Sequence, residues 1–180
     1  IVATTRPETM LGDTAVAVNP DDKRYKNIIG SILILPIINR EISVITDESI
    51  DKEFGTGAVK VTPNHSLVDS DIADRHNLPR ITIIDKFGKM TAEAGEEFKD
   101  LSVKDAREKI ILKLKELNFI EKTEDYIHRV SKCYRCNSII EPQSSKQWFL
   151  RMEELGKKAK EAVEGDNPKI KFNDDKWKKI

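Results

Sequence analysis

Two segments, far apart in the chain, concentrate hydroxyl, cationic and acidic side chains. The first is Thr4-Thr5-Arg6-Pro7-Glu8-Thr9, and the second runs over residues 55–65 and on to Asp69. The start of the second segment, Gly55-Thr56-Gly57, would let the backbone approach a ligand closely, because glycine carries no side chain. The hydroxyl, cationic and acidic side chains of both segments can form hydrogen bonds with a polar ligand. The two segments are therefore candidates for one polar site.

The spacing within the second segment also suits chemistry. Lys60 and Thr62 share one face of a strand, because side chains alternate along a strand. His65 and Asp69 are four residues apart, so a helix would place both on one side. An aspartate near a helix start, beside a lysine, could bind an ammonium group or position a water molecule. Taken alone, a glycine-rich turn before an acidic helix start is more often structural.

Short strands and a few helices are predicted to position these residues. Apolar runs and alternation indicate strands at the N-terminus and over residues 14–18, 32–38, 41–46, 58–61 and 81–84. Helical spacing indicates helices over residues 65–76, 103–117 and 151–163, with Ser102 as a cap of the second. This order favours an α+β fold with a β-barrel-like core and flanking helices over an alternating parallel α/β sheet.

Composition limits the functional classes. The chain has 180 residues, with 31 Lys plus Arg against 31 Asp plus Glu and a net charge of +0, so a strongly basic nucleic-acid binder is not indicated. No apolar run is long enough to span a membrane, and no signal peptide is visible. Two cysteines are too few for a secreted disulfide scaffold, which makes a cytoplasmic location the default expectation. The first residue is Ile1, and the simplest interpretation is a fragment of a longer protein.

The polar segments resemble the editing domain that valyl-, isoleucyl- and leucyl-tRNA synthetases, which are class I enzymes, share. The first segment is similar to the threonine-rich motif of that domain, and residues 54–63 with His65 and Asp69 are similar to its second pocket motif. The version Glu53-Phe54-Gly55-Thr56-Gly57-Ala58-Val59-Lys60 is most like valyl enzymes. Residues 133–136 and 141–149 resemble the segment by which the valyl editing insertion returns to the catalytic domain. The resemblance thus covers nearly the whole chain.

The resemblance implies an organisation and an activity. Residues 1–125 would form the editing core, residues 126–150 a cysteine knuckle and return linker, and residues 151–180 a helical segment leading back to the catalytic domain of a parent synthetase. The implied activity is post-transfer editing, in which an aminoacyl-tRNA deacylase hydrolyses the ester of Thr-tRNA(Val). An isoleucyl or leucyl editing domain is an alternative, and so is a catalytically degenerate module that only binds the tRNA end.

The resemblance also assigns roles to residues. Asp69 would bind the α-ammonium of the aminoacyl ester, with Lys60 and Thr62 completing the catalytic set. Substrate would be bound by nine further residues: Thr4, Thr5, Arg6, Thr9, Phe54, Gly55, Thr56, His65 and Ser66. The family pattern His-Asp-x-x-Asp is His65-Ser66-Leu67-Val68-Asp69 here, so Ser66 replaces the first acid and favours the degenerate module. The expected partners are the 3′ end of tRNA(Val) and the rest of the synthetase, with no membrane and a monomeric state.

Cys133 and Cys136 have the Cys-x-x-Cys spacing of half a zinc site. A structural zinc ion needs four ligands, and no second pair exists in this chain. We therefore expect no cofactor to be needed for editing, a structural zinc only in the full-length parent, and ATP to be used only by the parent's catalytic domain. A small zinc-ribbon nucleic-acid adaptor is the third functional class, and the missing second pair argues against it.

Overall fold

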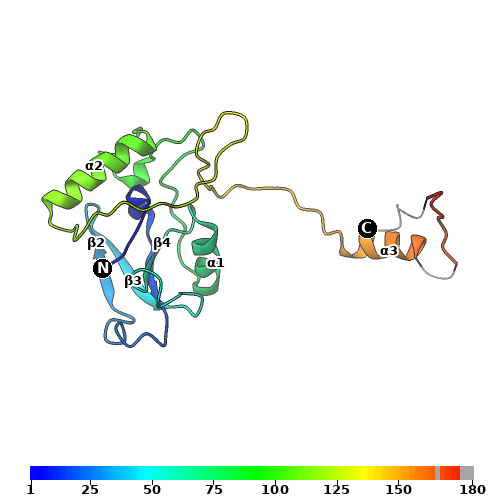
Figure 1. Cartoon of the computed structure of the whole chain (residues 1–180), viewed down its shortest axis with the longest axis horizontal. Helices are drawn as coiled ribbons and strands as arrows, with labels where there is room; N and C mark the ends of the chain where they lie inside the picture. Colours follow the sequence, from blue (N-terminus) through cyan, green and yellow to red (C-terminus); the bar gives the residue numbers. More distant parts are fainter. Residues whose placement is uncertain (165–166, 175–180) are drawn as a thin grey trace. The chain divides into compact units, whose positions relative to one another are not determined.

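The computed structural model describes residues 1–164 and 167–174 of the 180-residue chain. The chain divides into two compact units, Ile1–Ser144 and Ser145–Ile180, and each is described by itself. The first unit combines a small sheet with two α-helices and two short 3-10 helices, so the α+β class predicted from the sequence is confirmed (Figure 1).

A four-stranded sheet forms the centre of the first unit. Its strands are β1 (Ala15–Val18), β2 (Ile32–Leu35), β3 (Arg40–Thr46) and β4 (Ala58–Val61), in the order β2-β3-β1-β4. β1 runs parallel to β3 and antiparallel to β4, while β2 and β3 form an antiparallel hairpin. All four residues of β1 are buried, as expected for an apolar strand with neighbours on both edges. In the antiparallel pairing of β1 with β4, Ala15 lies opposite Val61, so the N-terminal segment that precedes β1 lies beside the C-terminal end of β4.

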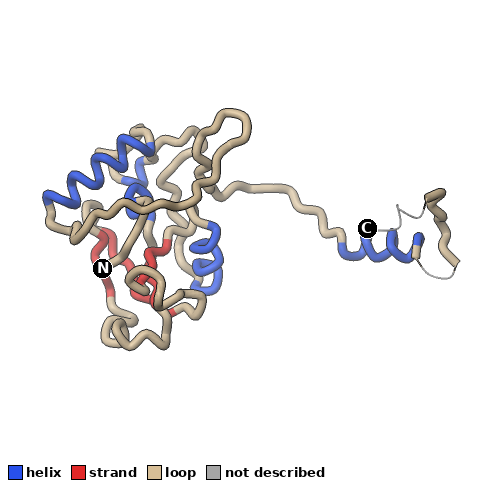
Figure 2. The backbone as a smooth tube through the Cα atoms, in the orientation of Figure 1, coloured by secondary structure: helices blue, strands red, loops and turns tan. Residues whose placement is uncertain are grey.

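Helices and turns cover the sheet and form the rest of the core (Figure 2). They are η1 (Pro7–Gly12), α1 (Leu67–His76), η2 (Ala92–Ala94) and α2 (Val103–Glu116). Ser102 caps α2, since its hydroxyl accepts from the backbone N–H of Asp105. α2 buries Ala106, Ile110 and Leu114 in a cluster with Phe98. The N-terminal 3-10 helix η1 contacts α2 and lies beneath it in Figure 1.

The sheet is open, so the barrel-like closure expected from the sequence is not observed among the described residues. The β-branched run 81–84 was expected to be a strand, but it contributes only an isolated bridge between Ile84 and Met90. Ile83 and Ile84 are fully buried by side-chain packing instead. No strand forms over residues 1–5, and the first strand of the hairpin ends at Leu35. In the order β2-β3-β1-β4, β4 is an edge strand of the sheet.

Residues 117–144 are mostly irregular, with one bridge between Lys132 and Ile139 around the cysteine turn. The second unit contains α3 (Glu153–Val163), in which no residue is buried. Residues 165–166 and 175–180 of the predicted helical segment 151–180 lie outside the described residues. In the described part of the chain, no helix combines the length and the apolar character that crossing a membrane requires.

Candidate functional site

The structure brings the two polar segments together at the end of β4. The ammonium of Lys60 lies 2.7 Å from the Thr9 hydroxyl, 2.7 Å from the Thr62 hydroxyl and 3.2 Å from Oδ1 of Asp13. Thr9 comes from η1 and Thr62 directly follows β4, so strand alternation and the fold of the N-terminal segment both contribute. We call these four residues, Thr9, Asp13, Lys60 and Thr62, the Lys60 cluster.

Asp13 is a member of this cluster that the sequence did not single out. Its side chain is 2% exposed, and its Oδ1 accepts hydrogen bonds from both Lys60 and the Thr62 hydroxyl. Burial raises the pKa of Asp13 from 3.8 to about 6, although the charge of Lys60 and the two hydrogen bonds oppose the increase and Asp69 adds to it. The site therefore contains a buried carboxyl that changes its charge near neutral pH.

Asp69 lies in the first turn of α1, next to the Lys60 cluster. Ser66 caps this helix, because its hydroxyl accepts from the backbone N–H of Asp69 at 3.3 Å. One carboxylate oxygen of Asp69, Oδ2, accepts from the backbone N–H of Thr62 at 2.8 Å. The other oxygen, Oδ1, makes no hydrogen bond within residues 1–164 and 167–174. Asp69 thus fixes the backbone of Thr62 through one of its two carboxylate oxygens.

His65 is buried and held from one side. Its Nε2 accepts from the backbone N–H of Ile83 at 3.0 Å, so the neutral ring carries its proton on Nδ1. Burial lowers the pKa of His65 from 6.5 to about 4, and the charges of Arg6 and Lys60 add to this, while the nearby backbone of Pro142 opposes it without a hydrogen bond to Nδ1. These contacts place His65 in a structural position and leave Nε2 unable to act as a base.

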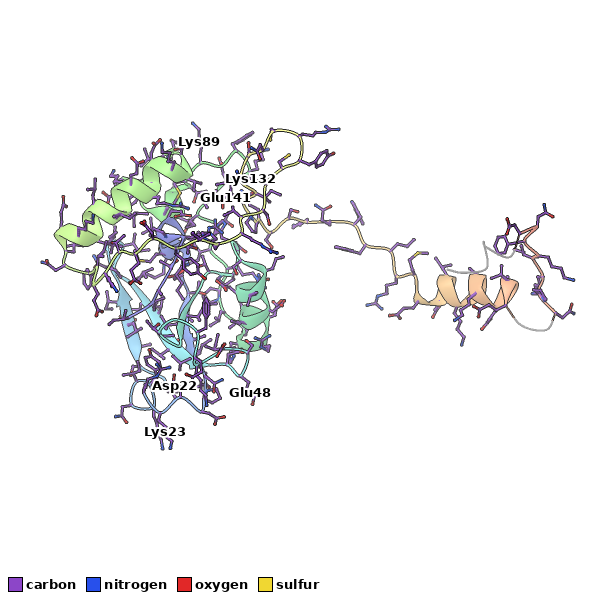
Figure 3. All side chains as sticks on the ribbon, in the orientation of Figure 1. Asp22, Lys23, Glu48, Lys89, Lys132 and Glu141 are labelled. Atoms are coloured by element: carbon purple, nitrogen blue, oxygen red, sulfur yellow. The ribbon has the colours of Figure 1, made fainter. Side chains whose placement is uncertain are left out.

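Arg6 connects the N-terminal segment to two other parts of the unit. Its guanidinium donates to the His65 carbonyl at 3.1 Å and pairs with Glu8 and with Glu141. Glu8 is fully buried and also accepts from Arg107 of α2, at 2.7 Å and 2.9 Å. Burial raises the pKa of Glu141. Figure 3 shows Glu141 at the opposite end of the unit from Asp22 and Lys23. A four-residue ion network therefore ties the pocket segment to α2 and to residues 137–144.

The loop over residues 52–57 is anchored through its backbone. The Tyr25 hydroxyl donates to the Thr56 carbonyl at 2.5 Å, and Arg24 donates to the Lys52 carbonyl at 2.6 Å. Gly57 has φ +75°, and a Cβ there would lie 2.5 Å from the Arg24 guanidinium. A Cβ on Gly55 would lie 3.8 Å from that of Ala3, so this loop adjoins the N-terminal segment.

The other residues predicted to bind substrate lie around this centre. Phe54 is 67% exposed. Thr4 and Thr5 are exposed, and the Thr4 hydroxyl accepts from the backbone N–H of Arg6 at 3.0 Å. The structure thus joins Thr9, Lys60, Thr62 and Asp69 directly, while among the described residues Phe54, Thr4 and Thr5 make no hydrogen bond or ion pair with the Lys60 cluster.

Cys133 and Cys136 lie in the turn closed by the Lys132–Ile139 bridge. Hydrogen bonding between Cys136 and Ser138 lowers the pKa of the Cys136 thiol, which favours the thiolate form that binds metals. Among residues 1–164 and 167–174, no group of three His, Cys, Asp or Glu residues lies close enough to hold a metal ion. That the pair forms half of a four-ligand zinc site stays a prediction.

Comparison with known proteins bears on the resemblance. No family model matches the chain. The chain is 54% identical over all of its 180 residues to a valine–tRNA ligase of Thermotoga maritima, and 51% identical to that of Pseudothermotoga lettingae, covering 20% and 21% of those proteins. The chain is homologous to a segment of valyl-tRNA synthetases. It spans about a fifth of the length of these relatives.

A solved structure agrees with this assignment at the level of fold. The crystal structure of GlLeuRS-CP1 superposes with a TM-score of 0.50 and 18% sequence identity, covering 65% of this chain and 79% of that one. The resemblance to the editing (CP1) domain of class I synthetases, most like the valyl enzymes, is therefore confirmed. Valyl relatives at about half identity favour a valyl over an isoleucyl or leucyl origin.

Sequence reasoning missed the acidic residues that hold the site together. Asp13 follows Thr9 by four residues and stands just before the buried run of β1, which is an unusual place for a charge. Glu8 lies inside the threonine-rich motif itself. Their partners Lys60 and Arg107 are 47 and 99 residues away in sequence. Local spacing carries no signal for pairings of that range.

Proposed function

We propose that this segment hydrolyses the ester of Thr-tRNA(Val), as the editing site of a valyl-tRNA synthetase. The observation that carries the proposal is the placement of Asp69: its Oδ2 binds the backbone of Thr62, whose hydroxyl contacts the Lys60 ammonium, and its Oδ1 makes no hydrogen bond within residues 1–164 and 167–174. A hydrophobic pocket for valine cannot strongly reject threonine, and valyl-tRNA synthetase is itself the established example of this limit. A second, polar site can select threonine over valine, because its polar groups bind the side-chain hydroxyl of threonine.

The proposed reaction is a direct attack of water on the ester. Asp69 Oδ1 accepts from the α-ammonium of the substrate in a charge-assisted hydrogen bond. Arg6 and the loop over residues 4–9 position the terminal adenosine. Water adds to the ester carbonyl, the bond from the acyl carbon to the ribose oxygen breaks, and threonine and tRNA with a free hydroxyl are released. No covalent enzyme intermediate is needed.

Lys60 and Thr62 act in this scheme by holding the site in place. The three N–H groups of the Lys60 ammonium are each directed at a partner within the cluster, and the Thr62 backbone is bound by Asp69. Lys60 therefore positions Thr9 and Thr62, which face the ester. Editing needs no cofactor in this scheme, ATP serves only the catalytic domain of the parent, and the partners are the 3′ end of tRNA(Val) and the rest of the synthetase.

A module that binds the tRNA end without hydrolysing it is the second candidate. Ser66 favours it, because a neutral side chain that caps α1 stands where the family pattern has an acid. Such a module would retain the Lys60 cluster and bind the aminoacylated end without releasing the amino acid.

Single-turnover hydrolysis distinguishes these candidates. The chain, in excess, is mixed with Thr-tRNA(Val) and with Val-tRNA(Val), and the free amino acid is followed. Threonine-selective release supports the editing proposal, and norvalyl and valyl esters on tRNA(Leu) and tRNA(Ile) test the leucyl and isoleucyl alternatives. Binding without release, in both the chain and the full-length parent, would leave the binding module as the function.

A further inference from the structure

The charges at the site are unequal in number. The cation is Lys60 of β4. The two anions are Asp13, in the segment before β1, and Asp69 of α1. Lys60 and Asp13 form an ion pair with 3.2 Å between Nζ and Oδ1. Asp69 has no cationic side-chain partner among the described residues. One negative charge therefore remains at the site.

The carboxylate of Asp13 is the anionic partner of the Lys60 ammonium. Both side chains are largely removed from water, with 2% of Asp13 and 14% of Lys60 exposed. An ion pair in such surroundings interacts strongly, because solvent screens it little. Asp69 binds the same residue as Asp13: the Thr62 backbone N–H donates to Asp69, and the Thr62 hydroxyl donates to Asp13.

We infer that Asp13 is a positioning residue for ammonium recognition: its carboxylate neutralises Lys60, so that the charge of Asp69 stays available for the α-ammonium of an aminoacyl ester. The inference rests on the proposed function and adds to it the source of the charge balance. A cation entering beside Asp69 then meets one uncompensated anion. With a neutral residue at position 13, it would meet Lys60 and Asp69 as a pair of zero net charge.

The surrounding charges leave this balance intact. Arg40 of β3 donates to the Leu11 carbonyl at 2.7 Å and faces Glu93 as well as Asp13. Arg6 is paired with Glu8 and Glu141, and Arg107 with Glu8. His65 is neutral above about pH 4, because burial lowers its pKa to about 4. Burial raises the pKa of Glu141, which pairs with Arg6, and it raises the pKa of Asp13, the partner of Lys60, to about 6.

Binding of two stable analogues tests the inference. The first is adenosine carrying a threonyl group through an amide in place of the ester, and the second replaces its α-amino group by a hydroxyl. Calorimetry at pH 7 is expected to show that the wild-type chain binds the ammonium analogue about tenfold more tightly than the hydroxyl analogue. Asp13→Asn should bring this ratio towards one and leave the affinity for the hydroxyl analogue within about twofold.

A double variant separates charge from structure. In Asp13→Asn/Lys60→Met both charges of the pair are absent, so Asp69 is again uncompensated and the preference for the ammonium analogue should return. A purely structural role of Asp13 predicts no such recovery. Asp47→Asn is the matched control, because Asp47 is also a buried carboxylate that pairs with a cation, Arg75, outside the site. That variant should keep the wild-type ratio.

The wild-type chain provides a test that needs no variant. Lowering the pH from 7 to 5 protonates Asp13, so the preference for the ammonium analogue should fall, while Asp13→Asn should show no such change. A wild-type preference that is absent at pH 7, or that persists in Asp13→Asn, would overturn the inference. Selective binding without hydrolysis would remove the proposed function alone, and hydrolysis with an unchanged ratio in Asp13→Asn would remove this inference alone.

Discussion

The buried side chain of Asp13 makes the free energy of unfolding depend on pH. Burial raises its pKa from 3.8 to about 6, so the folded chain holds a proton that the unfolded chain has already lost between these values. Stability contributed by this group is present below about pH 4 and is lost as the pH rises to about 6. The loss amounts to about 3 kcal/mol.

Asp13→Asn removes this titration. The free energy of unfolding of the variant, relative to the wild type, should therefore increase by up to about 3 kcal/mol between pH 4 and pH 7. Urea denaturation at both pH values measures the difference, with Asp71→Asn on the exposed side of α1 as the control. A difference that is the same at both pH values would mean that the pKa of Asp13 is not raised.

His65 is expected to titrate in the opposite sense. Its pKa is lowered to about 4 by burial, so it stays neutral in the folded chain where an ordinary histidine becomes charged. An NMR titration should give a pKa near 4 for His65, with the proton on Nδ1 because Nε2 accepts from Ile83. A pKa of 6 or above, or a proton on Nε2, would contradict the hydrogen bond to the Ile83 backbone.

At the scale of elements, the loop over residues 52–57 depends on the close approach of its backbone to Arg24. Gly57→Ala would combine a left-handed backbone with a Cβ 2.5 Å from the Arg24 guanidinium and 2.9 Å from the Lys52 carbonyl. Gly88 has nearly the same φ, +73° against +75°, with nothing within 4 Å of its Cβ position. The two glycines separate backbone strain from steric clash.

Gly88→Ala should cost about 1 kcal/mol from strain alone, and Gly57→Ala about 2–3 kcal/mol because the clash adds to it. Thermal unfolding measures both variants, and Gly57→Ala should also weaken binding of a threonyl-adenosine analogue. Equal costs for the two variants would show that Arg24 moves away without penalty.

Elements with a clear local pattern could be predicted from the sequence. The helix over residues 103–117 and the strand over 58–61 match α2 and β4 within a residue. The helix buries Ala106, Ile110 and Leu114 at the spacing that predicted it. The strand predicted over residues 81–84 was wrong, because β-branched residues form a strand only where a neighbouring strand is available to pair with them. Ile83 and Ile84 are buried by packing alone.

At the scale of the whole molecule, the site depends on contacts that local spacing does not encode. Lys60 and Thr62 could be placed on one face by alternation, and Asp69 near a helix start by the helical spacing over residues 65–76. Asp13, Glu8 and their partners could not, because they meet only when the unit folds, as with Arg6 and Glu141, which are 135 residues apart. Closure into a barrel likewise depended on a pairing of residues 81–84 that does not form.

The central claim is that Asp69 binds the ammonium of a threonyl ester for hydrolysis. The most direct measurement is the single-turnover release of threonine from Thr-tRNA(Val) by the wild-type chain, Asp69→Asn and Asp71→Asn. The side-chain carbonyl of asparagine can still accept from the Thr62 backbone, so the fold is retained while the charge is lost. We predict a rate about a hundredfold lower for Asp69→Asn and an unchanged rate for Asp71→Asn. Equal rates for Asp69→Asn and wild type would contradict the account.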